Sequence, residues 1–286
     1  MTEKCCLCPH KCGVDREKNF GRCHSLSEMR ICRIAPHFYE EPPISGTKGS
    51  GTIFFGGCSL DCEFCQNYKI SKSYAGIPYS PEKLADELKK LEESGVHNVN
   101  FVTPTHFSDK IRLALDIYRP KIPIIYNTSG YELPSLITEL LPYVDIFLTD
   151  MKYSSDDVSK KYSRCSDYVG FCKESTDIMI KNKPLVFDGD LMKQGVIVRH
   201  LVLPGELKNT FGVIDYFTRY KGKAYLSVMS QFTPEYRSSI KRGLTPLEYK
   251  IVLRKIIESG IDECFVQELS SASEEYIPEF NTGNEN

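Results

Sequence analysis

The amino-acid sequence predicts an α/β fold in which parallel β-strands form a barrel or a partial barrel. Two observations carry this prediction. After residue 50, segments typical of strands alternate with segments typical of helices, and this alternation requires parallel strands joined by right-handed crossovers. In addition, the strand-like run "IPIIYN" at 122–127 is apolar on both faces, as the strands of a buried parallel sheet are.

Each predicted element has a local signal. The first strand, "TIFFGG" at 52–57, ends in glycines. The first long helix, at 80–98, has Ser80 as its N-cap and Pro81 in its first turn, and Gly95 stops it. Further helices are predicted at 108–119, 133–144, 155–183, 211–220 and 245–260. The remaining strands are predicted at 98–104, 122–127, 145–150, 195–205 and 224–232, with a last one at 264–269.

Composition divides the chain into three parts. Residues 1–47 are rich in Cys, Pro and Gly, which predicts a small metal-binding segment and then a loop into the first strand. Residues 48–270 carry the alternating elements of the predicted barrel, and residues 271–286 are predicted to be a polar tail. In such a barrel the chemistry takes place at the carboxyl ends of the strands.

Composition and charge exclude several classes of protein. The 286 residues carry a net charge of −2 and a pI of about 6.3, without basic clusters, which argues against a nucleic-acid partner. No apolar run is long enough to span a membrane, and the N-terminus lacks the apolar core of a signal peptide, so a cytoplasmic protein is predicted. Thiols stay reduced in that compartment, where clustered cysteines indicate metal sites rather than disulfides.

Of the twelve cysteines, one group follows the first predicted strand in "GGCSLDCEFCQNY" at 56–68. Cys58, Cys62 and Cys65 have the spacing C-x3-C-x2-C and lie in the first βα loop, on the catalytic face of the predicted barrel. A [4Fe–4S] cluster normally takes four cysteines, so three leave one iron free to bind a substrate or a cofactor. The alternative is a zinc site completed by His106 or by a remote cysteine.

A second group of cysteines near the N-terminus forms a complete set of four ligands. Its spacing is C-x2-C-x3-C-x10-C, and its members are Cys5, Cys8, Cys12 and Cys23. Zinc and a second iron–sulfur cluster both suit this set, and either would order a segment with little apolar content. The other cysteines are predicted to be structural: Cys6, Cys32, Cys165, Cys172 and Cys264.

Several motifs together resemble the pyruvate formate-lyase-activating-enzyme-like proteins of the radical S-adenosylmethionine (SAM) superfamily. They are "CLCPHKCGVDR", "PISGTKGSGTIFFGGCSLDCEFCQNYKIS", "NFVTPTH", "YNTSGYE", "DMKY" and "VRHLVLPG". The resemblance as a whole runs from about residue 5 to residue 236. The resemblance implies a partial (β/α)6 barrel in which Cys58, Cys62 and Cys65 hold a catalytic [4Fe–4S] cluster whose open iron binds SAM. It also implies reductive cleavage of SAM to a 5′-deoxyadenosyl radical that abstracts hydrogen from a substrate.

The resemblance also implies where SAM is contacted. The usual Gly-Gly-Glu motif after the second strand is replaced here by Thr103-Pro104-Thr105. In the activating enzymes an Asp/Thr pair and a later Asp help to bind a monovalent cation near SAM, but here Asn127 stands at the first position and carries one charge fewer. The residues expected to contact SAM are Thr103, Thr105, Asn127, Thr128, Asp150, Lys152 and Arg199. The alternative role of Lys152 is simply to pair with Asp150, and His200 is expected to point away from the barrel interior.

The substrate is the least constrained part of this interpretation. The resemblance favours a protein or a peptide, such as a glycine in a partner protein, and a small molecule is the alternative. The implied partner is a reductant such as flavodoxin or ferredoxin. A rival class of function is a non-catalytic iron–sulfur protein that transfers electrons or senses metal.

Overall fold

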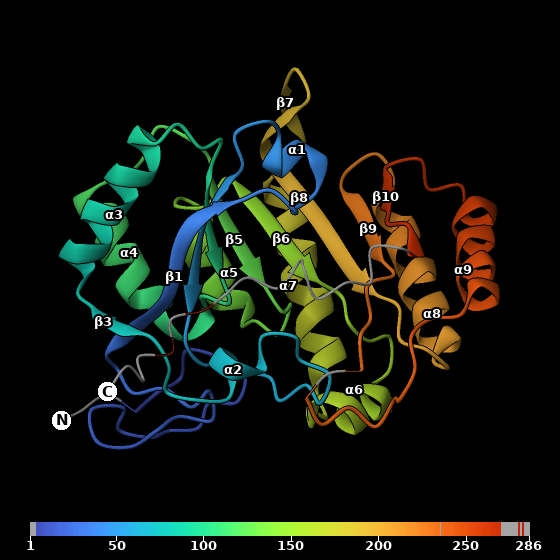
Figure 1. Cartoon of the computed structure of the whole chain (residues 1–286), viewed down its shortest axis with the longest axis horizontal. Coiled ribbons are helices and arrows are strands. Elements are labelled where there is room, and N and C mark those ends of the chain that lie inside the picture. The colour runs from blue at the N-terminus through green and yellow to red at the C-terminus, as the bar shows by residue number, and fades with distance from the viewer. Residues whose placement is uncertain (1–3, 235, 270–279, 281, 283–286) are drawn as a thin grey trace.

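The computed structural model describes residues 4–234, 236–269, 280 and 282, and a β-sheet with helices on its outer face forms its centre (Figure 1). The strands are β1 Met29–His37, β2 Ser50–Phe55, β3 Ile77–Tyr79, β4 Val99–Val102, β5 Ile124–Thr128, β6 Ile146–Asp150, β7 Val186–Asp188, β8 Leu191–Leu201, β9 Tyr225–Met229 and β10 Cys264–Val266. The helices are α1 Pro42–Ser45, α2 Tyr68–Ser71, α3 Pro81–Glu93, α4 Ser108–Ile117, α5 Pro134–Leu140, α6 Asp156–Ser163, α7 Tyr168–Asn182, α8 Leu207–Phe217 and α9 Pro246–Ser259.

The sheet confirms the predicted fold class. Its strand order is β10-β9-β8-β6-β5-β4-β2-β1-β3, and every neighbouring pair from β2 to β10 is parallel. The six predicted strands correspond to β2, β4, β5, β6, β8 and β9, and the last predicted strand to β10. In the described part of the chain β3 and β10 form the two edges and do not pair with each other, so the sheet is an open, partial barrel.

The prediction of a loop between the cysteine-rich segment and the barrel is wrong for residues 29–37, because these residues form the strand β1. This strand pairs antiparallel with both β2 and β3, and it places His37 opposite Ser50 and Ile31 opposite Ile77. A shift of register between Ile31 and Arg33 interrupts the alternation of side chains along β1. Because the alternation is interrupted, the sequence pattern does not reveal the strand.

Three smaller departures from the prediction lie in the second half of the chain. β8 begins at Leu191 because β7 folds back onto it through Gly189, which has a φ of +59°. The predicted helix at 155–183 is divided into α6 and α7 at Arg164, whose φ is +52°. The predicted polar tail at 271–286 lies outside the described residues except for 280 and 282.

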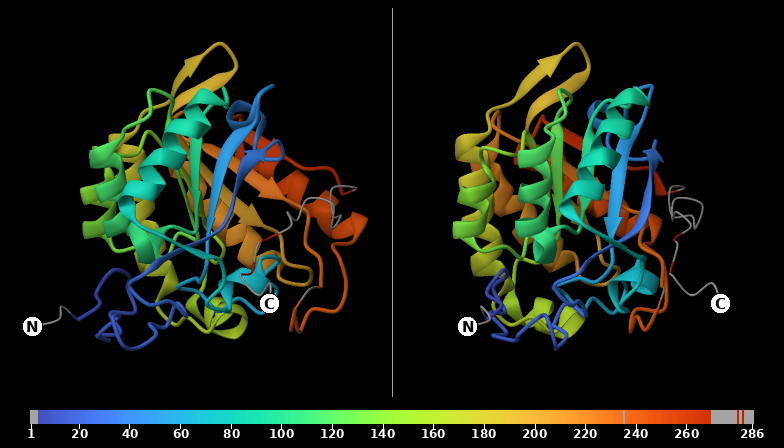
Figure 2. Two further views of the ribbon diagram at one scale, coloured as in Figure 1. Left: turned by 60° about the vertical axis from the view of Figure 1, so that its left-hand side comes forward. Right: turned by 90° about the vertical axis from the view of Figure 1, so that its left-hand side faces the viewer.

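Packing leaves the barrel interior open at the carboxyl ends of its strands. Near the amino ends, Ile44 of α1 packs inside the barrel against Ile125, Leu148 and Ile197, and its carbonyl accepts a hydrogen bond of 2.7 Å from Asn98. The cysteine-rich segment lies at the opposite end of the molecule from α1, on the side of α2 and α6 (Figure 2). None of the described helices has the length and apolar character that crossing a membrane requires.

Candidate functional site

The loop that carries Cys58, Cys62 and Cys65 leaves β2 through two glycines. A Cβ on Gly56 would lie 2.3 Å from the carbonyl oxygen of Ala75, and one on Gly57 would lie 2.5 Å from that of Cys23. Gly57 also has a φ of +89°, which side-chain-bearing residues rarely adopt. The two glycines therefore allow the close backbone packing that places Cys58 at the carboxyl end of the sheet.

The three cysteines and the ends of the neighbouring strands line one cavity of about 260 Å³. Consecutive parallel strands bring their carboxyl ends to the same edge, which gathers residues that are far apart in the sequence. Six of the seven residues predicted to contact SAM line this cavity: Thr103, Asn127, Thr128, Asp150, Lys152 and Arg199. The seventh, Thr105, is not among the lining residues.

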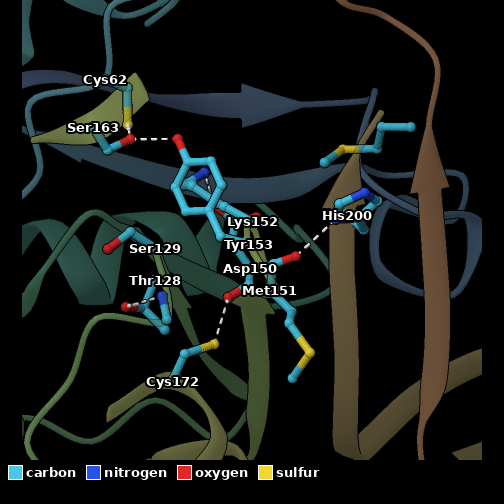
Figure 3. A network of polar contacts seen from close by, with 12 residues as sticks. Cys62, Thr128, Ser129, Asp150, Met151, Lys152, Tyr153, Ser163, Cys172 and His200 are labelled. Atoms are coloured by element: carbon cyan, nitrogen blue, oxygen red, sulfur yellow. Dashed lines mark hydrogen bonds and ion pairs between the residues drawn. The ribbon is translucent and has the colours of Figure 1, made fainter. Parts of the chain in front are cut away.

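Two of the cysteine sulfurs have hydroxyl neighbours that fix them in place. The Ser163 hydroxyl lies 2.9 Å from the Cys62 sulfur and is itself hydrogen-bonded to the Tyr153 hydroxyl (Figure 3). The Ser71 hydroxyl lies 3.2 Å from the Cys65 sulfur. These contacts orient the thiols before any metal is bound.

Asp150 and Lys152 form an ion pair at the end of β6 (Figure 3). The Tyr168 hydroxyl accepts a hydrogen bond of 3.0 Å from the Lys152 backbone amide and donates one of 2.8 Å to the Ser129 carbonyl. Burial acts to lower the pKa of Lys152, but the charges of Asp150 and Cys62 outweigh it and raise that pKa. The pairing that was the alternative role of Lys152 is therefore present, and Lys152 stays cationic beside the cavity.

Arg199 is held by two glutamates that precede α1. Its Nε donates a hydrogen bond of 2.8 Å to the carboxylate of Glu41. Its Nη2 donates hydrogen bonds to the carboxylates of both Glu40 and Glu41. The three side chains are only 12%, 9% and 7% exposed, so this is a buried ionic triad. Arg199 lines the cavity, but its guanidinium already has two carboxylate partners.

Thr103 adopts a strained backbone conformation at the edge of the cavity. Its φ is +58°, which is a genuine outlier for a β-branched residue, and its amide donates a hydrogen bond of 2.9 Å to the Asn127 carbonyl. Strain of this kind persists only where the surrounding structure fixes it, and it is concentrated at functional sites.

The cavity and its surroundings match a known family. Residues 52–186, which contain the cysteine triad and the ends of β4, β5 and β6, match the sequence profile of the radical SAM superfamily. The chain belongs to this superfamily. An uncharacterized protein of Methanocaldococcus jannaschii is 31% identical to this radical SAM chain over 276 residues, which is 92% of this chain and 77% of that protein.

Solved radical SAM structures share the architecture. SuiB of Streptococcus suis aligns with a TM-score of 0.52 and 13% identity over 75% of this chain and 48% of its own, so this chain spans about half the length of SuiB. A radical SAM methyltransferase from Sphaerobacter thermophilus aligns with a TM-score of 0.51 and 12% identity over 87% of this chain and 80% of its own. At these identities the likeness establishes the fold.

Membership of the radical SAM superfamily implies a [4Fe–4S] cluster and SAM, and the donor set of the cavity fits them. Burial raises the pKa of Cys58 to about 12 and also raises that of Cys65, so these thiols need a compensating cation to ionise. Iron supplies that charge. Among the described residues, no three His, Cys, Asp or Glu side chains are placed to hold a single metal ion.

Thr105, whose predicted contact with SAM stays a prediction, has a hydrogen-bond partner within the fold. Its hydroxyl donates a hydrogen bond of 2.6 Å to Glu132, which also accepts from the hydroxyls of Thr128 and Tyr126. Glu132 is fully buried, and its second carboxylate oxygen has no hydrogen-bond partner among the described residues. Burial raises the pKa of Glu132 to about 7, although the three hydroxyls act to lower it.

Glu132 makes the stability of the fold depend on pH. The pKa of this carboxyl is raised from 4.5 to about 7 by folding, so the native state binds its proton more tightly than the unfolded chain. The free energy of unfolding is therefore expected to fall by roughly 3 kcal/mol as the pH rises from 4.5 to above 7. Urea unfolding of reconstituted protein under anaerobic conditions measures this loss. The Glu132→Gln variant should largely lack it, whereas the exposed control Glu258→Gln should keep it; an unchanged pH dependence in Glu132→Gln would contradict this account.

The predicted N-terminal cysteines lie near one another, although among the described residues they are not positioned around a single metal ion. Backbone hydrogen bonds of 3.0 Å from Cys5 to Val14 and from Gly13 to Cys5 close the loop around Cys8 and Cys12. A Cβ on Gly21 would lie 3.1 Å from the Cys23 sulfur and 3.8 Å from the Cys12 sulfur, so these two sulfurs face the same point. Burial raises the pKa of the Cys8 thiol, and the charges of Cys23 and Cys5 add to this rise.

Sequence reasoning missed the acidic residues around the site. Glu40 and Glu41 precede two prolines in "EEPPIS", and Glu132 stands between Tyr131 and Leu133 in an otherwise apolar and small-residue context. An acidic residue predicted to be buried needs a partner, and this signal could have marked all three positions. His200 agrees with the prediction, because its ring contacts the Met151 carbonyl and the Thr210 hydroxyl on the helix-facing side (Figure 3 shows the first contact).

Proposed function

We propose that this protein is an enzyme that cleaves SAM reductively and abstracts hydrogen from a substrate in the cavity at the carboxyl ends of the strands. The observation that carries the proposal is that Cys58, Cys62 and Cys65 line one cavity with polar groups from consecutive strands. We assign the [4Fe–4S] cluster to these three cysteines. When bound, the cluster and SAM supply the electron transfer and the 5′-deoxyadenosyl radical.

The residues of the cavity then act by binding and by orientation. Thr103 offers backbone groups in a fixed, strained geometry, and Asn127 and Thr128 offer neutral polar contacts to SAM. Lys152 offers a cation for the SAM carboxylate, and because it already neutralises Asp150, we propose that it replaces a bound monovalent cation. Arg199 shapes the cavity through Glu40 and Glu41 rather than by binding SAM on its own.

A second cavity, of about 490 Å³, adjoins the first and is our candidate for the substrate site. The two cavities share the lining residues His37, Glu40, Arg199, Met229 and Gln231. Tyr39, which is 61% exposed, and Val266 of the edge strand β10, which is 49% exposed, also line the second cavity. We favour a protein or peptide substrate, since exposed apolar groups beside a strand that forms the edge of the described sheet suit a polypeptide. A small-molecule substrate is the competing outcome.

The N-terminal cysteines complete the proposal. We assign a second metal centre to Cys5, Cys8, Cys12 and Cys23, and we favour an iron–sulfur cluster over zinc because it allows the site to take part in electron transfer. The iron content of anaerobically reconstituted protein distinguishes the two: about eight irons are expected from two cubes, and about four irons with one zinc from the alternative.

The test of the function is SAM cleavage. Reconstituted protein reduced with dithionite is expected to convert SAM to 5′-deoxyadenosine and methionine, and a non-catalytic electron carrier or metal sensor would not. Adding lysate fractions separated by size identifies the class of substrate. Stimulation by the high-molecular-weight fraction, with a persistent protein radical in electron paramagnetic resonance (EPR), supports a polypeptide. Stimulation by the low-molecular-weight fraction alone refutes it and leaves a small-molecule enzyme.

A further inference from the structure

We infer that the N-terminal cysteine site is the entry point for electrons, which it passes to the Cys58, Cys62 and Cys65 site through a direct backbone contact. The inference rests on the proposed function, because it takes both cysteine sets to hold iron–sulfur clusters. The source of the electron is a low-potential one-electron carrier protein with an acidic surface. The carrier is oxidised when it loses one electron, and the catalytic site is reduced when it gains that electron. The transfer therefore balances without another reactant.

The two cysteine sets are joined ligand to ligand. The amide of Cys58 donates a hydrogen bond of 3.0 Å to the carbonyl oxygen of Cys23. A few covalent bonds on either side of this hydrogen bond lead to a sulfur of each set. Cys23 is buried, so the connection is shielded from water. A bridge of this kind offers an electron a continuous bonded path between the two sites.

The contact between the two sites is rigid. A Cβ on Gly57 would lie 2.2 Å from the Ser25 hydroxyl, so the backbone before Cys58 lies directly against the N-terminal segment. The Ser25 hydroxyl donates a hydrogen bond of 3.3 Å to the Gly56 carbonyl, and the His10 ring nitrogen lies 2.8 Å from the Ser59 carbonyl. The N-terminal segment therefore contacts the catalytic loop on both sides of Cys58, at Gly56 and at Ser59.

Arg16 fixes the N-terminal segment to the barrel itself. It is 8% exposed and donates hydrogen bonds of 2.6 Å to the His106 carbonyl and 2.5 Å to the Leu26 carbonyl. Its guanidinium also lies 5.4 Å from the centre of the Phe107 ring. Arg16 therefore holds the N-terminal segment against the residues that follow β4, beside the active-site cavity.

The charge of the segment indicates the partner. Apart from the four cysteines and the cluster that they would hold, residues 4–24 contain five Lys and Arg against two Asp and Glu, so these side chains sum to +3, whereas the whole chain carries −2 on the same count. Lys11, Lys18 and Arg22 are exposed, and Phe20, which lies between Lys18 and Arg22 in the sequence, is 55% exposed. Exposed basic residues and an exposed aromatic residue in one segment suit an acidic protein partner, since complementary charge speeds encounter and an aromatic anchor supplies contact area.

The first test uses the Cys8→Ala/Cys12→Ala double variant and two reductants. Removing two ligands leaves the N-terminal set with two thiols, fewer than the three that hold a cube, so the iron content should fall from about eight to about four while the catalytic cluster and its SAM-induced EPR change remain. With dithionite, which reaches both sites, the variant should form 5′-deoxyadenosine at the wild-type rate. With reduced flavodoxin, its rate should fall to that of the control without flavodoxin. Freeze-quenched EPR should show slow reduction of the catalytic cluster by flavodoxin, which is a readout independent of turnover.

Other outcomes of this test overturn the relay. Equal loss with both reductants indicates a structural role for the N-terminal site, and no loss with flavodoxin indicates direct reduction of the catalytic site. One zinc in place of four irons also contradicts the relay. Failure of the wild-type protein to cleave SAM with dithionite would sink the proposed function instead, and the EPR measurement of cluster reduction would still decide the relay.

A second variant guards against misfolding of the first. Lys11→Glu combined with Arg22→Glu reverses exposed charges without touching a cysteine, so the iron content and the dithionite rate should stay at wild-type values. The rate with flavodoxin at low ionic strength should fall by about tenfold or more, and the difference should shrink as salt is added. The control Lys89→Glu reverses an exposed charge on α3, and it should behave as wild type. An unchanged flavodoxin rate in the double variant contradicts docking at the N-terminal segment.

Discussion

Replacing Cys62 by alanine is expected to abolish SAM cleavage. In the proposed assignment three thiolates hold one cube and leave one iron for SAM, so loss of one thiolate leaves the catalytic cluster without enough protein ligands. Reconstituted Cys62→Ala should contain about four irons instead of about eight, should show no EPR change on addition of SAM, and should form no 5′-deoxyadenosine with dithionite. In the proposed assignment the four irons that remain are those of the N-terminal set.

The matched control is Cys32→Ala. Cys32 is a buried cysteine of β1 that belongs to neither set, and its 2% exposure makes its environment as closed as that of Cys62. This variant should keep the full iron content and the SAM-dependent signal, and it should lose only about 1 kcal/mol of stability for the removed sulfur. SAM cleavage that survives in Cys62→Ala, or disappears in Cys32→Ala, would falsify the assignment of the catalytic ligands.

The sequence predicted the cavity well because the information is local. Cys58, Cys62 and Cys65 lie within one loop, and the polar residues at 127–128 and 150–152 follow buried strands whose apolar runs are unmistakable. Once the strands are known to be parallel and consecutive, their ends must meet at one edge. The prediction therefore needed periodicity and chain order, but no side-chain packing.

The parts that the sequence did not predict depend on contacts between distant segments. Arg199 and Glu41 are 158 residues apart, and nothing in either local sequence indicates that they meet. β1 was missed because its shift of register hides the alternation, and its partners β2 and β3 follow it in sequence but flank it in space. The role of Thr105 was missed because its partner, Glu132, comes from the turn after a different strand.

The buried triad of Arg199 with Glu40 and Glu41 gives the second large effect. Arg199→Met is expected to lower the free energy of unfolding by about 3–5 kcal/mol, because it leaves two carboxylates buried without their cation. Burial acts to raise the pKa of Glu41 and Arg199 lowers it, so in the variant this carboxyl should take up its proton at a higher pH than in the wild type. Anaerobic urea unfolding measures the loss of stability, and this loss should shrink at acidic pH, where Glu41 becomes neutral.

Two further variants test whether the loss of stability comes from the burial of the triad or only from the loss of an ion pair. Arg254 and Glu258 also form a pair, at 2.7 Å, but their side chains are 79% and 57% exposed, so Arg254→Met should cost less than about 0.5 kcal/mol. Combining Arg199→Met with Glu40→Gln and Glu41→Gln removes the unpaired charges and should recover much of the lost stability. If Arg199→Met costs no more than Arg254→Met, water reaches the triad, and the triad does not fix the shape of the cavity. If Arg199→Met costs several kcal/mol and the triple variant recovers that stability, the triad fixes the residues that line both cavities. The effect of Arg199→Met on SAM cleavage should then follow the loss of that shape rather than the loss of a positive charge at the cofactor.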